Sequence, residues 1–269
     1  MTALVDDPLI AGMAIRRVLP LHESSRRLRS LYPECPRVYG VAVMEDVSKR
    51  RWWPLASALS GEKFEQMYGD AAREMDSRTA AAQQLAATLA HAVIGRVVAL
   101  VVLEGRAWDT GVENLWVHVD SEGAIDWLGV VDPTLRVLPE DPCSAAEGVV
   151  ELPSEAALAT WIAHRCHRSL TPLFRRLHEV SDGAVSVASM WHTVGTAIVV
   201  AATQVPQLAG SSEVVGMRRG QAVLDALVGF GLPVRGEAGL RGRAAGQRPR
   251  FLRASRHEGL ANLGQPCLS

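Results

Sequence analysis

Two groups of polar side chains on predicted helices have the residue types that binding or catalysis would need. The first is the run H-R-C-H, in which His164, Cys166 and His167 lie close together. His164 and His167 are three residues apart and share one face of a helix, a spacing at which two imidazoles can reach one ion. Cys166 points elsewhere, and the sequence offers no obvious third ligand. The run therefore allows two interpretations, a weak metal site or solvated, hydrogen-bonded histidines.

The second group is a polar stripe of Ser189, His192 and Thr196, which share a helical face beside Trp191. An apolar helix with such a stripe must give it hydrogen-bond partners, because unpaired buried polar groups destabilise a fold. The stripe either faces a ligand pocket or bonds to a neighbouring helix. In a pocket, His192 would be the catalytic proton donor, Trp191 a flat apolar wall, and Ser189 and Thr196 polar contacts to the ligand.

Arginines form a third group, a candidate anion-binding rim. Arg175 and Arg176 are adjacent on a predicted helix, and Arg250 and Arg253 lie in a C-terminal tail rich in Gly and Arg. The rigid guanidinium fork suits carboxylates and phosphates. The alternatives are a solvated basic tail and an RNA-binding tail. Base stacking has little support, because Phe251 is the one aromatic residue of the tail.

Patterns for other common sites are missing from the sequence. None of the four cysteines pairs with another at C-x-x-C spacing, so there is no zinc or iron–sulfur signature. The phosphate-loop, dinucleotide and G-x-S-x-G patterns are absent. Asp126, Asp132 and Glu151 lie near a predicted hairpin, but their spacing predicts no acid/base pair. We expect no bound cofactor; the alternative is haem or a mononuclear metal bound through His164, His167 or His192.

Composition bounds the class of protein. The 269 residues suffice for one large domain or two modest ones. The net charge of -1 gives no general attraction to nucleic acid. The first ten residues hold two aspartates where a signal peptide is basic, and the longest apolar stretch, 93–103, is interrupted by Arg96 and too short to span a bilayer. We expect a cytoplasmic protein with no nucleic-acid partner and no membrane span; its oligomeric state is open.

Periodicity predicts an α+β fold that is predominantly α-helical. Residues 1–150 are expected to form a mixed part with a small antiparallel sheet and a long helix, and residues 151–269 a helical part with an irregular basic tail. The two parts are either separate domains or one compact domain. The predicted elements of the first part are a short helix within 6–21, a buried strand at 37–44, a helix from Asp76 or Ser77 to about Val102, and a hairpin near 114–131.

The helices predicted for the second part follow a covering loop or linker at 139–153. They span about 154–180, 184–205 and 212–230. The first either continues through Pro172 or restarts there, and the second is expected to end at Pro206.

Three segments of the second part carry a family resemblance. They are R-S-L-T-P-L-F-R-R-L at 168–177, V-S-V-A-S-M-W-H-T-V-G at 185–195, and the end of the chain from R-P-R-F-L-R at 248–253 to L-G-Q-P-C-L at 263–268. In order and position they resemble the ferric-siderophore reductases of the FhuF type. The resemblance covers the part of the chain from about Trp161 onward.

The tail of that family binds a [2Fe–2S] cluster through two adjacent cysteines, a third after ten residues, and a fourth after two more. Aligning Cys267 with the last ligand places Leu252 and Arg253 at the adjacent pair and Gly264 at the third position. Leu and Gly have no ligating side chain, and Arg stays protonated. The resemblance therefore implies a reductase scaffold in which Cys267 is the single remaining ligand, and a [2Fe–2S] cluster is not expected.

Such a scaffold can keep its ligand pocket without its electron carrier. We expect a small-molecule-binding protein or enzyme of siderophore or other specialised-metabolite chemistry, with an acidic ligand or a metal chelate. The first alternative is a ferric-siderophore reductase or a haem- or metal-dependent enzyme that uses another cofactor. The second is a non-catalytic siderophore-binding protein.

The absent cysteine spacing predicts a colourless protein. Protein purified without oxygen should have neither a Soret band nor the visible bands of an iron–sulfur cluster, since the chain lacks the thiolates that hold one. A UV–visible spectrum and an assay for iron and acid-labile sulfide check this. Stoichiometric iron and sulfide would contradict it, and a Soret band would support the haem alternative.

Overall fold

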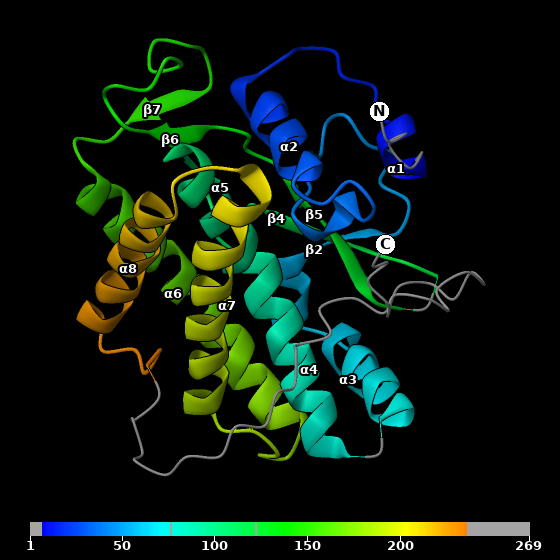
Figure 1. Ribbon diagram of the computed structural model, residues 1–269. Helices are drawn as coiled ribbons and strands as arrows, with labels where there is room; N and C mark the ends of the chain where they lie inside the picture. Colours follow the sequence, from blue (N-terminus) through cyan, green and yellow to red (C-terminus); the bar gives the residue numbers. More distant parts are fainter. Residues whose placement is uncertain (1–6, 76, 122, 236–269) are drawn as a thin grey trace, which may run out of the picture.

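The computed structural model describes residues 7–75, 77–121 and 123–235 (Figure 1). The structure is 56% helical with 11% strand, which confirms the expected α+β, predominantly helical class. The basic tail, with Arg250, Arg253 and Cys267, lies outside the described residues, so the expectations for it stay predictions.

The described residues form helices and two small sheets. The helices are α1 (Pro8–Ala11), α2 (Pro20–Ser30), α3 (Lys63–Glu74), α4 (Arg78–Ala90), α5 (Arg96–Glu104), α6 (Glu155–Val180), α7 (Val187–Ala209) and α8 (Glu213–Gly229), with 3-10 turns η1 (Pro36–Val38) and η2 (Leu55–Leu59) and a π-helical turn η3 (His91–Gly95). The strands are β1 (Val41–Val43), β2 (Trp52–Pro54), β3 (Ala107–Trp108), β4 (Leu115–Val119), β5 (Ile125–Val130), β6 (Leu135–Val137) and β7 (Val149–Glu151).

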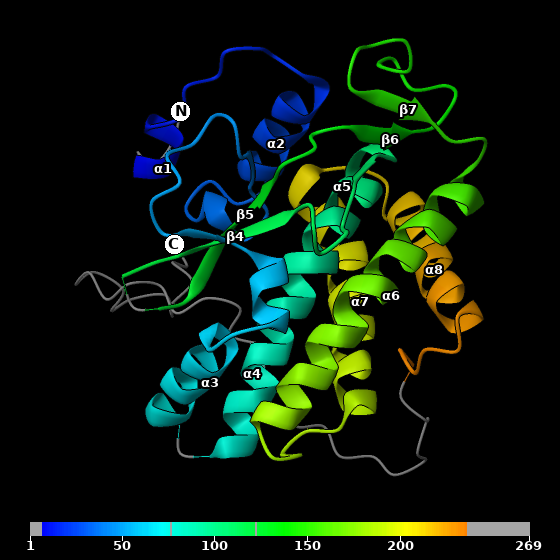
Figure 2. The ribbon, with the colours of Figure 1, turned by 180° about the vertical axis from the view of Figure 1, so that it is seen from behind.

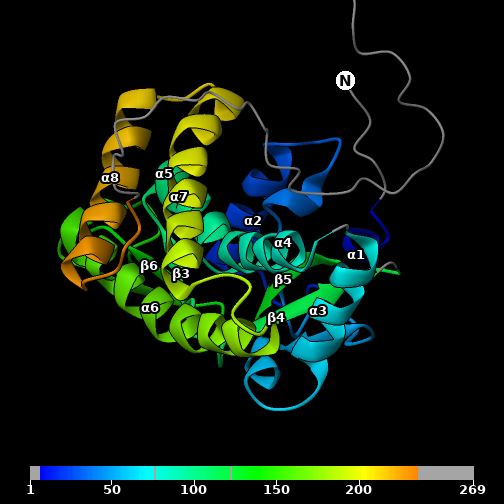
Figure 3. The same ribbon diagram turned by 90° about the horizontal axis from the view of Figure 1, so that it is seen from below.

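The central element is one helix, Arg78–Glu104, formed by α4, η3 and α5. It confirms the predicted long helix, and the Ser77 hydroxyl caps it by accepting from the Ala80 amide at 3.3 Å. The helix is apolar and long enough to cross a membrane, a longer run than the 93–103 stretch suggested. In this structure 83% of its most apolar window is buried. Viewed from below, α4 lies between α7 and α3 with α6 alongside (Figure 3).

Two mixed sheets lie beside the upper half of this helix (Figure 2). The first has the order β1-β5-β4-β2, and the predicted hairpin is confirmed as its antiparallel β4–β5 pair. The second has the order β3-β6-β7. The sheets are not purely antiparallel as expected, because β1 pairs with β5, and β6 with β7, in parallel. The loop expected at 139–153 contains β7.

Three predicted element boundaries were wrong. The strand expected at 37–44 is reduced to β1, because Pro36 starts the turn η1. The helix expected over 6–21 is limited to α1, and α2 starts only at Pro20, after an irregular segment. Pro206 does not end α7: it is buried against α8 at Gly216, and the helix ends at Gly210 in the left-handed conformation, φ 61°. Helix α6 continues through Pro172, one of the two alternatives.

Buried apolar residues form two clusters. The larger runs from Leu21 to Val234 and includes residues from both halves of the chain. The smaller lies on one face of the first sheet and consists of Ala42, Met44, Trp52 and Trp127, with α1 packed against it. This second cluster, called the aromatic face below, separates α1 from the sheet.

The π-helical turn places a histidine and an arginine against the start of β1. His91 Nε2 bonds to the Val38 carbonyl at 2.7 Å, and Arg96 donates to the carbonyls of Gly40 at 2.5 Å and Asp126 at 2.8 Å. Burial, followed by the charge of Arg96, lowers the pKa of His91 to about 4 from 6.5. His91 is therefore neutral in the folded protein at neutral pH.

This neutral histidine predicts acid sensitivity. Protonation favours the unfolded chain, so the stability it contributes is fully present above pH 6.5 and is lost as the pH falls from 6.5 toward 4. The loss should reach at most about 3 kcal/mol. Urea unfolding between pH 7 and pH 4 checks this, and His91→Gln should flatten the profile in that window. His164→Gln, a change at an exposed histidine, should leave the profile as in the wild type; an equal flattening there would refute the assignment.

Candidate functional site

One member of the polar stripe expected to face a ligand, Thr196, bonds within α7, as does the neighbouring Thr193. The hydroxyls of Thr193 and Thr196 donate to the carbonyls of Ser189 and His192, four residues earlier, at 3.3 and 3.1 Å. Trp191 is buried in the main core at 2% exposure, where the edge of Phe174 meets its ring. His192 is half-buried. The structure thus keeps these residues on one helix but places Trp191 among core side chains.

The H-R-C-H run lies on α6 as expected, with its histidines on one face. Phe230 lies beside both imidazoles, with its ring centroid 6.0 Å from that of His164 and 5.9 Å from that of His167. Cys166 points into the core, where burial raises the pKa of its thiol to about 12 and Thr110 Oγ1 lies 3.3 Å from Sγ. Within the described ranges, no three His, Cys, Asp or Glu side chains lie together as a metal ion would require.

The paired arginines of α6 separate in space. Arg176 forms an ion pair with Glu65 of α3 and approaches Glu179 at 3.6 Å. Arg175 is exposed. The two guanidinium groups therefore do not face one ligand together in this conformation. Arg250 and Arg253, the other members of the expected rim, are outside the described residues.

The sequence analysis missed a row of rings on the aromatic face. The strand register places Trp52 of β2 opposite His118 of β4, and His118 opposite Trp127 of β5. The rings of Trp52 and His118 are 5.3 Å apart. Trp116 lies two residues from His118, so it belongs to the same face. One imidazole therefore lies within a surface of three indoles.

A β-bulge brings a carboxylate to this imidazole. His118 pairs with Trp127 and Val119 pairs with Ile125, so Asp126 has no partner across the strands. Such an extra residue bends the strand and redirects a side chain. Here Asp126 Oδ1 lies 2.6 Å from His118 Nδ1, with the Asp126 side chain 3% exposed. Alternation alone would have placed Asp126 on the opposite face of β5 from Trp127.

Two more charges extend this pair into a chain of four. Arg37 Nη1 donates to Asp126 Oδ2 at 2.5 Å, and Arg37 Nε donates to Asp7 Oδ2 at 2.6 Å. Burial alone would lower the pKa of Arg37, but the hydrogen bonds and charges of Asp7 and Asp126 outweigh it and raise that pKa. The order of contacts is therefore Asp7, Arg37, Asp126 and His118, called the relay below.

The relay leaves one ring nitrogen of His118 open. A carboxylate can only accept hydrogen bonds, so this contact requires the hydrogen on Nδ1, and a neutral imidazole then keeps its lone pair on Nε2. Nε2 has no hydrogen-bond partner among the described residues, and the His118 side chain is 15% exposed. This is how an orienting carboxylate prepares a histidine to accept a proton. His22 differs, because its Nδ1 accepts from the Leu19 amide and its Nε2 bonds to Asp46.

Cations line the edge of the aromatic face. Lys49 Nζ lies 5.4 Å from the centroid of Trp116, within the range of a cation–π contact. Arg50 and Arg51 follow it and are exposed. Arg51 has φ 65°, a left-handed conformation that is uncommon for a residue other than glycine. The loop that turns from β1 to β2 thus presents positive charge beside the indoles.

Comparison of the chain with protein-family models, curated proteins and solved structures gave no match. The resemblance to the ferric-siderophore reductases accordingly stays an expectation from the sequence.

The open nitrogen predicts selective reactivity toward diethyl pyrocarbonate, which modifies imidazole lone pairs. His118 should be ethoxycarbonylated at Nε2, and Asp126→Asn should slow the reaction because the ring loses its orienting carboxylate. His22, with both nitrogens bonded, is the matched control and should stay unmodified in the folded protein. Peptide mass spectrometry over time measures both rates. Modification of His22 as fast as that of His118 would contradict the assignment.

Proposed function

We propose that the protein is an enzyme that binds a small molecule on the aromatic face and moves a proton at His118 Nε2. The observation that carries this proposal is the buried Asp126 carboxylate on His118 Nδ1, with the opposite nitrogen unpaired among the described residues. General acid/base catalysis needs this combination of a fixed tautomer and an accessible lone pair. Trp116, which is partly exposed, offers a flat ring surface on which an apolar part of a ligand can lie.

Arg37 supports the same assignment. Its guanidinium bonds to both Asp7 and Asp126 and so holds the Asp126 side chain in place against His118. A carboxylate in that position stabilises the imidazolium that forms when Nε2 takes a proton. The relay thus supplies a positioned base and compensates the charge that develops on it.

The expected class of ligand comes from the sequence. The resemblance to ferric-siderophore reductases makes an iron chelator or a related specialised metabolite the first class to examine, and the cations beside Trp116 favour an acidic one. The chemistry proposed at His118 is proton transfer and uses no iron–sulfur cluster. Non-catalytic binding of the same ligand would need the indoles and cations but not the Asp126–His118 pair.

The test is binding and turnover of a panel of hydroxamate, catecholate and carboxylate chelators, each iron-free and iron-loaded, measured by calorimetry and by mass spectrometry of products. For a turned-over ligand, His118→Gln should lower kcat about 10²–10⁴-fold, the usual contribution of a positioned base. Affinity should change little, because Gln keeps a polar side chain of similar length.

Two matched variants decide between sites. His164→Gln, at an exposed histidine of α6, should leave kcat unchanged. His192→Ala tests the residue that the sequence favoured: unchanged turnover removes it from the mechanism. Turnover that survives His118→Gln but is lost in His192→Ala would refute the proposal and place the chemistry on α7.

A further inference from the structure

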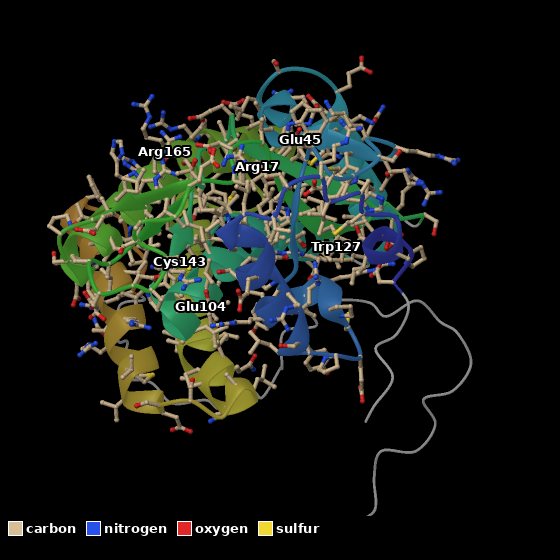
Figure 4. The ribbon with its side chains drawn as sticks, turned by 90° about the horizontal axis from the view of Figure 1, so that it is seen from above. Arg17, Glu45, Glu104, Trp127, Cys143 and Arg165 are labelled. Atoms are coloured by element: carbon tan, nitrogen blue, oxygen red, sulfur yellow. The ribbon has the colours of Figure 1, made fainter. Side chains whose placement is uncertain are left out.

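The aromatic face is covered by α1, the shortest α-helix of the described chain. Helix α1 has four residues, none of them fully buried, and Leu9, Ile10 and Met13 pack half-buried against the cluster of Trp52 and Trp127. Figure 4 shows Trp127 beside this N-terminal helix. A helix of this length is not stable by itself in water. Segments with few buried contacts open at the low end of the range of local stabilities.

Beneath this cover lies a hydrogen-bond donor without a partner. The Trp127 side chain is fully buried, and its indole N–H has no acceptor among the described residues. Buried donors are nearly always paired, and an unpaired one destabilises the closed state. Trp108 has an equally unpaired indole N–H, but it lies in the main core, away from α1.

Polar contacts hold α1 down, and one of them belongs to the relay. Asp7 caps the helix through Oδ1, which accepts from the Leu9 amide at 2.9 Å, and pairs with Arg37 through Oδ2. Just after the helix, the Ala14 amide donates to the Asp46 carbonyl at 2.8 Å. Because Arg37 also bonds to Asp126, the position of α1 is mechanically connected to the carboxylate that orients His118.

We infer that α1 is a lid, and that its opening uncovers a binding site for a planar aromatic anion. The ring stacks among Trp52, Trp116 and Trp127, an acceptor atom of the ligand takes the Trp127 N–H, and the negative charge lies near Lys49. The relay latches the lid through the Asp7–Arg37 pair. This inference rests on the proposed function and adds to it a class of ligand and a moving helix. Its test measures ligand binding alone, so it can fail or succeed independently of the catalytic role of His118.

The test uses anilinonaphthalene sulfonate, a fluorescent aromatic anion, with the full chain. Asp7→Asn removes the ion pair but keeps a helix cap, because Asn and Asp cap equally well. This variant should bind the probe about fivefold more tightly than the wild type, the range of a partly exposed ion pair. Leu9→Ser, which weakens packing of the lid instead of the latch, should act in the same direction. Affinity equal to the wild type in both variants would refute the lid.

Controls separate this site from general loosening of the protein. Asp182→Asn breaks the exposed Arg78–Asp182 pair far from α1 and should not change the affinity. In the Asp7→Asn background, Trp127→Phe should abolish the gain in affinity for the probe, whereas Trp108→Phe should leave that gain unchanged. Equal affinity of the two double variants would show that the proposed pocket is wrong. Circular dichroism confirms folding. Lys49→Gln changes an exposed side chain and should not affect folding. In the Asp7→Asn background it should also lower the affinity for the probe.

Hydrogen exchange of the wild type gives an independent measurement of the lid. The amides of Ala11 and Gly12, which bond to Asp7 and Pro8 within α1, should exchange much faster than those of β5. Saturating anilinonaphthalene sulfonate should speed exchange in α1 further if the ligand displaces the lid. Amides of α1 as slow as those of β5 would overturn the inference, whatever the activity assays of His118 show.

Discussion

The buried guanidinium of Arg96 is the interaction on which the rest of the site depends. It comes from the central helix, directly after the π-helical turn, and its two hydrogen bonds end on the carbonyls of Gly40 and Asp126. A charge 2% exposed is costly, and burial lowers the pKa of Arg96 to about 10, with Asp126 opposing the shift. The group remains protonated at neutral pH. It therefore fixes β5 to the helix at the residue where the strand bulges.

The bulge explains why a functional pair occurs in a hairpin that looks ordinary. Pairing without a bulge would place Asp126 on the face opposite Trp127, away from His118. The extra residue reverses this, and Arg96 holds the bulged carbonyl while Arg37 and His118 share the carboxylate. The cost of burying Arg96 and Asp126 is thus partly offset, because Arg96 donates to two backbone carbonyls and the Asp126 carboxylate bonds to Arg37 and His118. Arg96 Nε has no partner in the described chain, so the offset is incomplete.

Local patterns in the sequence predicted the elements of the fold much better than the site. Ser77, Ser154 and Ser212 start helices as capping residues do, and the alternation of N-L-W-V-H-V predicted β4. These signals act within a few residues. The relay joins Asp7, Arg37, Asp126 and His118, whose proximity depends on the parallel pairing of β1 with β5 and on the bulge. Neither the parallel pairing nor the bulge can be recognised from the spacing of these residues. For this reason the sequence predicted no acid/base pair at Asp126 and favoured His192 as the catalytic residue.

The connection between α1 and His118 has a thermodynamic consequence. Arg37 is shared by Asp7 and Asp126, so a lid that opens by releasing Asp7 leaves the guanidinium to Asp126 alone. Linkage requires the reverse to hold to the same extent: a ligand that contacts His118 and shifts Asp126 must also change the equilibrium between the closed and open positions of α1. The proposed base and the proposed lid are therefore not independent, because both use the same guanidinium. A change that loosens α1 acts on the orientation of His118 through Arg37, and a change at His118 acts on α1 by the same route.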